Sequence, residues 1–217
     1  MKKLFCAVLL SFAVFASVFA EKSKILSVGV TVPFVDTTAE WENDFADDHE
    51  KGKGFGLNFS LRAVNENRIS VLFEFDGDYI KFDDMDGLDV ALLFGAGFNL
   101  SPSDSWKIIL SGVVGVDLLG RDETNKAYKT DEDGSESSHD VDNIISLTNF
   151  LVGADLYISK RFKTSFGIFA QCTVGVGAGT AINETSWRLS RVNYSESVDG
   201  EGEIFFVMPK LGLCWNY

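Results

Sequence analysis

The chain has 217 residues, of which 19 are Lys or Arg and 32 are Asp or Glu, and its formal net charge is −13 at pH 7. A chain this acidic lacks the basic surface that binds phosphate backbones, so no nucleic-acid partner is expected. The same charge disfavours adsorption to anionic lipid head groups. The length suits a single all-β domain.

Residues 1–20 have the features of a secretory signal peptide. Lys2 and Lys3 are followed by an apolar run and by a small-residue cleavage site that ends at Ala20. Cleavage after Ala20 would leave one domain, residues 21–217, in an exported compartment. No later segment approaches the roughly 20 continuous apolar residues of a transmembrane helix. The exported domain is therefore expected either to be soluble or to cross a membrane as a closed β-barrel.

Eight later segments alternate apolar and polar residues with the period of two that β-strands show. In chain order they are residues 24–35, 53–64, 68–80, 88–100, 105–119, 144–160, 162–178 and 203–217. Each reaches the roughly 9–11 residues that a tilted strand needs to cross a bilayer. One face of each segment is apolar, and the other is rich in Gly, Ser, Thr and Asn. The pattern predicts an all-β fold, an eight-stranded antiparallel up-and-down transmembrane β-barrel with its apolar face toward lipid.

The connections between these segments alternate in length. The short ones are residues 65–67, 101–104 and 160–161, and the longer ones are residues 36–52, 81–87, 120–143 and 179–202. The longer connections hold 22 of the 32 acidic residues, counted along the sequence, where carboxylates stay hydrated. We therefore expect short periplasmic turns and longer acidic extracellular loops. An extracellular ligand would be held by loops 36–52, 120–143 and 179–202.

The final segment ends on Tyr217, with Trp215 and further apolar residues at alternate positions before it. This pattern resembles the carboxyl-terminal signal read by the barrel-assembly machinery of the bacterial outer membrane. With the strand and loop order, residues 21–217 resemble the small eight-stranded outer-membrane proteins of the OmpW, OmpX and opacity-protein type. The resemblance implies an outer-membrane location, a monomeric state, and contact with outer-membrane lipids and the assembly machinery. Pro209 departs from an ideal final strand because it lacks a ladder donor.

Three functions remain open at this point. The first is a structural or surface-interaction role for the acidic loops. The second is a channel for a small, hydrophobic solute, which the resemblance to OmpW-type proteins implies. The third is a lipid-modifying enzyme, since some small outer-membrane barrels are lipid A hydrolases or acyltransferases. A soluble lipocalin-like barrel, with its apolar face inward, is the alternative architecture. It would place Gly, Ser, Thr and Asn where water-facing surfaces usually carry many charges.

Four charged residues fall on the predicted inner faces: Arg62, Glu74, Asp155 and Lys210. An isolated buried charge is very costly, so these side chains are expected to pair inside the narrow barrel. The pairing could form a gate or a polar path, or it could simply fill the interior. We favour the second interpretation because eight strands leave room for little besides side chains.

Other motifs are weaker. Ser137, Ser138, His139 and Asp140 have the residue types of a hydrolytic site, but they occupy a polar loop without rigid support. The acidic run 131–136 begins like a calcium loop and lacks its later ligand spacing. We therefore expect no catalytic residue, no cofactor and no dedicated metal site.

Two cysteines remain after the signal segment, Cys172 and Cys214. They are expected to lie at different heights on their strands, too far apart for the roughly 7 Å limit of a disulfide, and so to stay unbonded.

Overall fold

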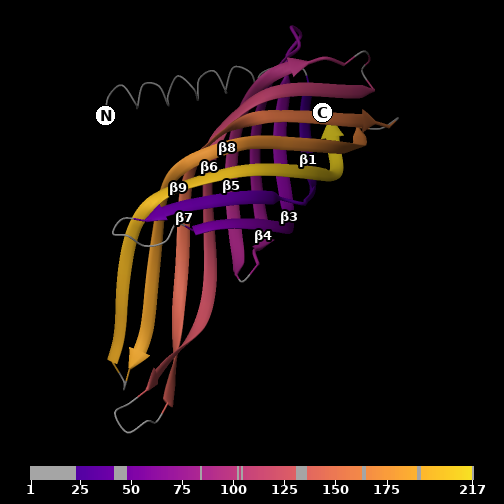
Figure 1. Ribbon diagram of the computed structural model, residues 1–217. Coiled ribbons are helices and arrows are strands. Elements are labelled where there is room, and N and C mark those ends of the chain that lie inside the picture. The colour runs from indigo at the N-terminus through magenta and orange to yellow at the C-terminus, as the bar shows by residue number, and fades with distance from the viewer. Residues whose placement is uncertain are drawn as a thin grey trace.

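The computed structural model describes residues 23–41, 48–83, 85–101, 103, 105–130, 136–162, 165–189 and 192–216, and so begins after the expected signal segment 1–20. Side chains are described for these residues except 123–130, 136–140, 187–189 and 192–194. The described chain is an antiparallel β-sheet that closes on itself (Figure 1). The strands are β1 (Ser23–Thr31), β2 (Phe34–Trp41), β3 (Asp48–Val64), β4 (Ile69–Lys81), β5 (Asp86–Asn99), β6 (Trp106–Thr130), β7 (Glu136–Arg161), β8 (Phe166–Leu189) and β9 (Val192–Asn216). No helix among these residues is long and apolar enough to cross a membrane.

The nine labelled strands form an eight-stranded barrel because β1 and β2 are two parts of one strand. Thr31 pairs with Lys210 and Phe34 pairs with Val207, so the register against β9 is the same on both sides of the break. The break contains Pro33 and lies beside Pro209, and proline has no N–H to give to the ladder. The ladder therefore lacks an N–H donor at each of these prolines. The unchanged register shows that the final strand has no bulge at Pro209. The prediction of eight antiparallel strands is confirmed.

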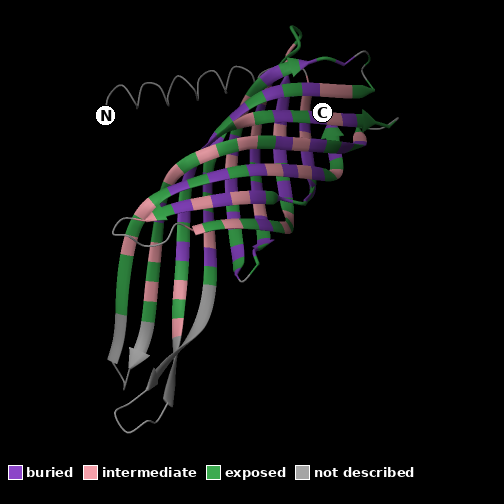
Figure 2. Cartoon of the chain, in the orientation of Figure 1, coloured by how far each residue is buried: buried purple, intermediate pink, exposed green. Residues whose placement is uncertain are grey.

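The two faces of the barrel differ as the alternation predicts. Large apolar side chains point outward and are exposed along every strand; Phe55 and Leu57, for example, are each 68% exposed. Figure 2 shows buried and exposed positions alternating along the strands. The inward positions carry the buried polar and charged residues. The lipocalin-like alternative, in which the apolar face points inward, is therefore wrong.

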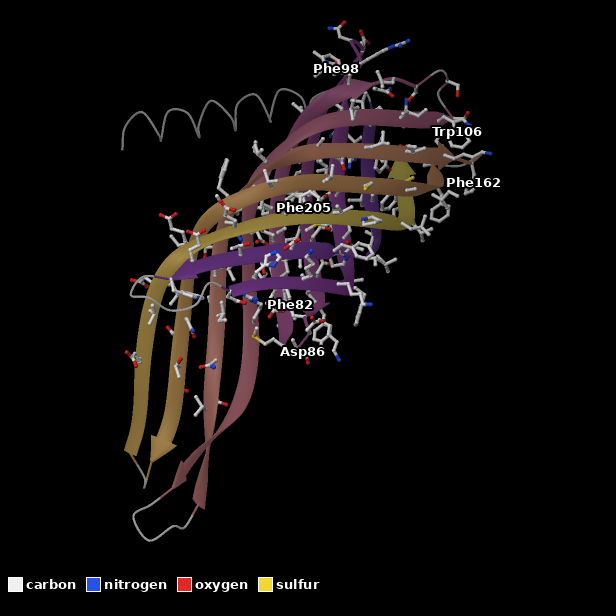
Figure 3. All side chains as sticks on the ribbon, viewed as in Figure 1. Phe82, Asp86, Phe98, Trp106, Phe162 and Phe205 are labelled. Atoms are coloured by element: carbon white, nitrogen blue, oxygen red, sulfur yellow. The ribbon has the colours of Figure 1, made fainter. Side chains whose placement is uncertain are left out.

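Aromatic side chains lie toward both ends of the outer face. Phe98, Trp106 and Phe162 lie at the end of the barrel that holds the short turns, and Phe205 lies farther along β9 (Figure 3). Trp215 packs edge-on against Phe166, with 5.4 Å between ring centroids. Aromatic rings in these positions are typical of the girdles that flank the apolar band of membrane barrels.

The structure corrects the longer predicted loops. Strands β6 and β7 pair without interruption from Trp106–Lys160 to Thr130–Glu136. Strands β8 and β9 pair from Phe166–Trp215 to Leu189–Val192. Most of residues 120–143 and 179–202 is therefore strand. Much of residues 36–52 is strand as well, within β2 and β3. The prediction of loops here is wrong because apolar–polar alternation marks only strands that bury one face. A strand with two polar faces pairs in the sheet but shows no such alternation.

The four long strands continue past the closed part of the barrel. Pairing of β5 with β6 ends at Asp86–Asp122, and pairing of β2 with β9 ends at Trp41–Gly200. Beyond these pairs β6 to β9 form a four-stranded sheet that projects from one end of the barrel (Figure 1). We call this part the sheet extension, comprising residues 123–130, 136–143, 182–189 and 192–199.

Candidate functional site in the barrel interior

The barrel interior is built in layers, and its floor is apolar. Six buried side chains form a cluster near the short turns: Ile25, Val64, Ile109, Tyr157, Phe169 and Cys214. Tyr157 and Phe169 stack with their ring centroids 5.4 Å apart. The Tyr157 hydroxyl lies 3.0 Å from Ser27 Oγ, so its polar tip has a buried partner. This floor cluster closes the lumen below the charged residues.

The four charged residues singled out in the sequence lie together above this floor. Arg62 Nη1 is 2.9 Å from Asp155 Oδ2, and Arg62 Nη2 is 3.6 Å from Glu74 Oε2. Lys210 Nζ forms a close ion pair with Glu74. All four side chains are fully buried. Glu74 therefore lies between two cations and links β3, β4 and β9.

Four further residues complete this ion-pair layer. Lys210 Nζ also lies 2.7 Å from Asp76 Oδ2, and Asn58 Nδ2 donates to Asp76 Oδ1 over 2.8 Å. Gln171 donates to Glu74, and Thr173 Oγ1 donates to Asp155 Oδ1 over 3.1 Å. Sequence reasoning missed these partners, although each occupies an inward position of its strand. Their inward positions, which the alternation of each strand already gives, could have identified them as candidates.

The charged layer also rests on the floor through an aromatic contact. The Arg62 guanidinium carbon lies 4.3 Å from the centroid of the Tyr157 ring. A guanidinium over an aromatic face is attracted by the ring quadrupole, most strongly where water is excluded. This contact fixes the orientation of Arg62 toward Asp155 and Glu74.

A second apolar layer covers the charges on the side of the sheet extension. Its buried members come from most strands of the barrel: Val35, Ala39, Ile80, Phe82, Met85, Ala91, Leu93, Leu119, Ile145, Leu147, Leu151, Ala181, Ile204, Phe206 and Met208. Near its rim, Arg121 Nη2 lies 2.6 Å from Asp48 Oδ2 and its guanidinium stacks over Phe82. The polar middle of the lumen is thus enclosed by apolar side chains at both ends.

The two residues expected to carry the assembly signal lie on β9 or just after it. Trp215 points outward and pairs across the barrel seam with Leu26 of β1. Tyr217 lies outside the described residues. The structure places Trp215 at the rim of the outer face and in the seam at which the barrel closes.

The remaining motifs fall largely outside the described side chains. Residues 131–135 lie outside the described chain, and the side chains of residues 137–140 are not among the described ones. His49 Nε2 lies 2.7 Å from Asp36 Oδ1, on the outer surface. Cys172 and Cys214 are free, and they point to opposite faces of the sheet.

A groove of about 560 Å³ lies on the outer surface where β2, β7, β8 and β9 run beside one another. Phe150, Val152, Val176 and Phe205 give it an apolar side, and Asp36 and Glu203 contribute carboxylates. It opens at the boundary between the exposed apolar side chains and the acidic base of the sheet extension. It is separate from the charged residues of the interior.

The barrel is similar to solved structures of outer-membrane proteins. The outer membrane protein OprG from Pseudomonas aeruginosa shares 10% identity, over 90% of this chain and 95% of that one, with a TM-score of 0.53. The attachment invasion locus protein Ail of Yersinia pestis shares 13% identity over 91% and 99% of the chains, with a TM-score of 0.47. Neisserial surface protein A shares 13% identity over 88% and 99%, with a TM-score of 0.39.

No protein-family model and no curated protein sequence matches this chain. At these identities the similarity to OprG concerns the fold alone. It agrees with the closed antiparallel sheet described above. The chain has the fold of the small eight-stranded outer-membrane β-barrels.

Proposed function

We propose that this protein is an integral barrel of the bacterial outer membrane that acts at the cell surface through its sheet extension. The exposed apolar belt supports membrane insertion, because only a closed barrel or a helix satisfies every backbone group in lipid. The sheet extension then lies beyond the lipid, on the side opposite the short turns. Its role is to bind another molecule rather than to pass one.

The observation that carries this proposal is the shape and charge of the sheet extension. Beyond Asp122 and Gly200, β6 and β9 each pair with one strand only among the described residues. A free strand edge is a template for an added strand from another chain. The side chains described for the sheet extension, those of residues 141–143, 182–186 and 195–199, include the exposed carboxylates of Asp142, Glu184, Glu196 and Asp199 and no Lys or Arg. Glu201 and Glu203 continue this acidic surface at the base of the extension. The partner that fits is an extended, basic segment of another protein.

The layered interior argues for binding over conduction. A water path would have to pass both the floor cluster and the upper apolar layer, and each contains large side chains such as Phe169 and Phe206. Eight strands enclose little more than the volume of their own inward side chains. A solute channel would need one of these layers to move.

The binding test uses the purified, refolded barrel and a fluorescent oligolysine peptide, with an oligoglutamate peptide as the negative probe. We expect saturable binding of oligolysine that weakens as salt is raised. The triple variant E184Q/D199N/E201Q should bind it at least tenfold more weakly. The matched control is D83N, which removes an exposed carboxylate from the turn between β4 and β5. Equal binding by the triple variant and the wild type would contradict the proposed surface.

Two further measurements separate the alternatives. In planar bilayers we expect little conductance, and large, stable single-channel steps would favour a solute channel. In cells that overproduce the protein we expect an unchanged lipid A mass spectrum. A shift equal to the loss or gain of an acyl chain would favour a lipid-modifying enzyme.

A further inference from the structure

The groove on the outer surface is built from two neighbouring rungs of outward side chains. The lower rung, on the side of the short turns, is apolar on three strands and ends in a carboxylate. Its members lie directly opposite one another on β7, β8, β9 and β2: Val152, Val176, Phe205 and Asp36. The three apolar side chains are exposed and continue the belt that faces lipid; Phe205 is labelled in Figure 3. Lipid chains therefore reach the groove from the side of the short turns.

The upper rung makes the surface hollow. Ala178 is exposed and carries only a methyl group, and it lies between Phe150 of β7 and Glu203 of β9. Phe150 is 61% exposed, so its ring stands out from the sheet. A small residue between two long ones leaves a space with an aromatic ring on one side and a carboxylate on the other. The groove is therefore apolar on the β7 side and charged on the β9 side.

The edge of the groove toward the sheet extension is negatively charged and has no cation. Glu40 of β2 and Glu201 of β9 are directly opposite each other and exposed, and they follow Glu203 along the outer face. None of the ion pairs among the described residues includes any of these three glutamates. Like charges placed directly opposite each other destabilise a sheet. A cation supplied by another molecule would relieve this repulsion.

The other carboxylate of the groove is already compensated. His49 Nε2 lies 2.7 Å from Asp36 Oδ1, and Lys51 Nζ lies 3.4 Å from Asp36 Oδ2. The uncompensated charge is therefore confined to Glu203 and the two glutamates beyond it. A ligand that fits this arrangement has its positive group beside Glu203 and its apolar part over the lower rung.

We propose that the groove binds a membrane lipid whose head group carries a primary ammonium. The ammonium pairs with Glu203, and the acyl chains lie against Phe150, Val176 and Phe205 beside the apolar belt. An anionic lipid would be repelled by the three glutamates, and a second copy of this chain would bring the same acidic surface. The inference requires that the barrel lies in a membrane, as proposed above, but it does not require a peptide partner at the strand edges.

The test compares photoactivatable phosphatidylethanolamine with photoactivatable phosphatidylglycerol, each with a diazirine on the same acyl chain. The first probe has a primary ammonium, and the second has none and is anionic. The full barrel is refolded into phosphatidylcholine vesicles that contain a small fraction of one probe. After illumination, labelled residues are identified by mass spectrometry. The phosphatidylethanolamine probe should label residues 174–180 and 203–207 about threefold more than the other probe, because an exposed ion pair contributes modestly.

Two variants and a control locate the lipid. Ala178→Trp fills the hollow and should lower labelling of the groove by phosphatidylethanolamine to the level seen with phosphatidylglycerol. Ala170→Trp changes an exposed alanine of the same strand nearer the short turns, and should label as the wild type does. Glu203→Gln should also lower phosphatidylethanolamine labelling of the groove. Heat-modifiable gel mobility shows whether each barrel is closed. If Ala178→Trp does not fold, Glu203→Gln decides the matter because its side chain is exposed.

Two results would overturn the proposal. The first is equal labelling of the groove by the two probes in the wild type. The second is a Glu203→Gln variant in which phosphatidylglycerol labelling rises while phosphatidylethanolamine labelling stays the same, since this would show repulsion of anions without an ammonium contact. Labelling of the belt outside the groove reports membrane insertion separately. Its absence with both probes would contradict insertion itself, and with it this site.

Discussion

Lys210 of β9 lies 2.7 Å from Asp76 of β4 and also contacts Glu74, so a single ammonium group bridges two carboxylates on the facing wall. Strands β4 and β9 are not neighbours in the sheet, which means that this contact crosses the lumen. It joins the wall that carries Asn58, through Asp76, to the wall that carries Thr173. The interior is thereby braced across its width.

The first prediction follows from this brace. Replacing Lys210 with Met should lower the free energy of unfolding by about 3–5 kcal/mol, because it leaves Asp76 without a cation and removes one of the two that flank Glu74. Urea titration of the refolded barrel measures the change. The control is Lys51→Met, since Lys51 is exposed and surface pairs contribute about 0–1 kcal/mol. The triple variant E74Q/D76N/K210M should recover most of the loss. Equal destabilisation by the single and triple variants would contradict the pairing.

The second prediction concerns two glycines on the closing strands. Gly212 and Gly29 are opposite each other, and the Phe169 ring lies against both. A Cβ on Gly212 would lie 2.2 Å from Val28 O and 2.8 Å from the Phe169 ring, so Gly212→Ala should destabilise the barrel by about 1–3 kcal/mol. Gly112→Ala is the matched control, because a Cβ there meets nothing within 4 Å. A larger loss in the control than in Gly212→Ala would show that the seam is not packed as described.

The third prediction compares the seam with a distant turn. Deleting residues 215–217 removes the pairings of Trp215 with Leu26 and of Asn216 with Ile25. Backbone groups left unpaired in lipid cost several kcal/mol each, so the truncated chain should be lost from the membrane fraction. Deleting residues 131–135, between β6 and β7, should leave insertion intact. Fractionation and heat-modifiable mobility report the outcome. If the chain without residues 215–217 inserts normally and the chain without residues 131–135 does not, the topology described here is wrong.

The fourth prediction concerns the cysteines. Cys172 points outward from β8 and Cys214 lies in the floor cluster, so they face opposite sides of the sheet. Reduction of the purified monomer should leave its intact mass unchanged. A gain of two hydrogens would reveal a disulfide. Cys214 should resist a water-soluble maleimide until the barrel is unfolded by heat, since its side chain is fully buried.

The transmembrane part of the fold was readable from the sequence because lipid enforces a strict alternation. Phe94 points outward while its neighbour Leu93 is buried. The same alternation along the other strands predicted that Arg62, Glu74, Asp155 and Lys210 face inward, and they do. The sheet extension was not readable, since water imposes no such rule and the polar residues there resemble a loop. At Pro33 a hydrogen bond is missing, so the first strand is divided into β1 and β2. Its register against β9 is nevertheless the same on both sides of Pro33.

The alternation of inward and outward positions could not show which interior charges would be partners. Asp76 and Asp78 occupy equivalent inward positions of β4, two residues apart. Lys210 reaches Asp76 from across the lumen, and no described cation reaches Asp78. That difference depends on the tilt of the strands and on the side chains of the opposite wall. Both are properties of the closed barrel, beyond what the pattern of a single strand reports.

The closing seam determines the order in which this barrel can be assembled. With β1 and β2 counted as one strand, seven of the eight pairings join strands that are consecutive in the chain. The eighth joins Ile25 to Asn216 across nearly the whole described length, so it carries the largest loop-closure cost. Pro33 and Pro209 further reduce the donors available along that seam. The seven pairings between consecutive strands can form one after another along the chain, whereas the barrel closes only once β9 is present. Until β9 pairs with β1 and β2, the growing sheet has two open edges, and each is a template on which a strand of another chain could pair.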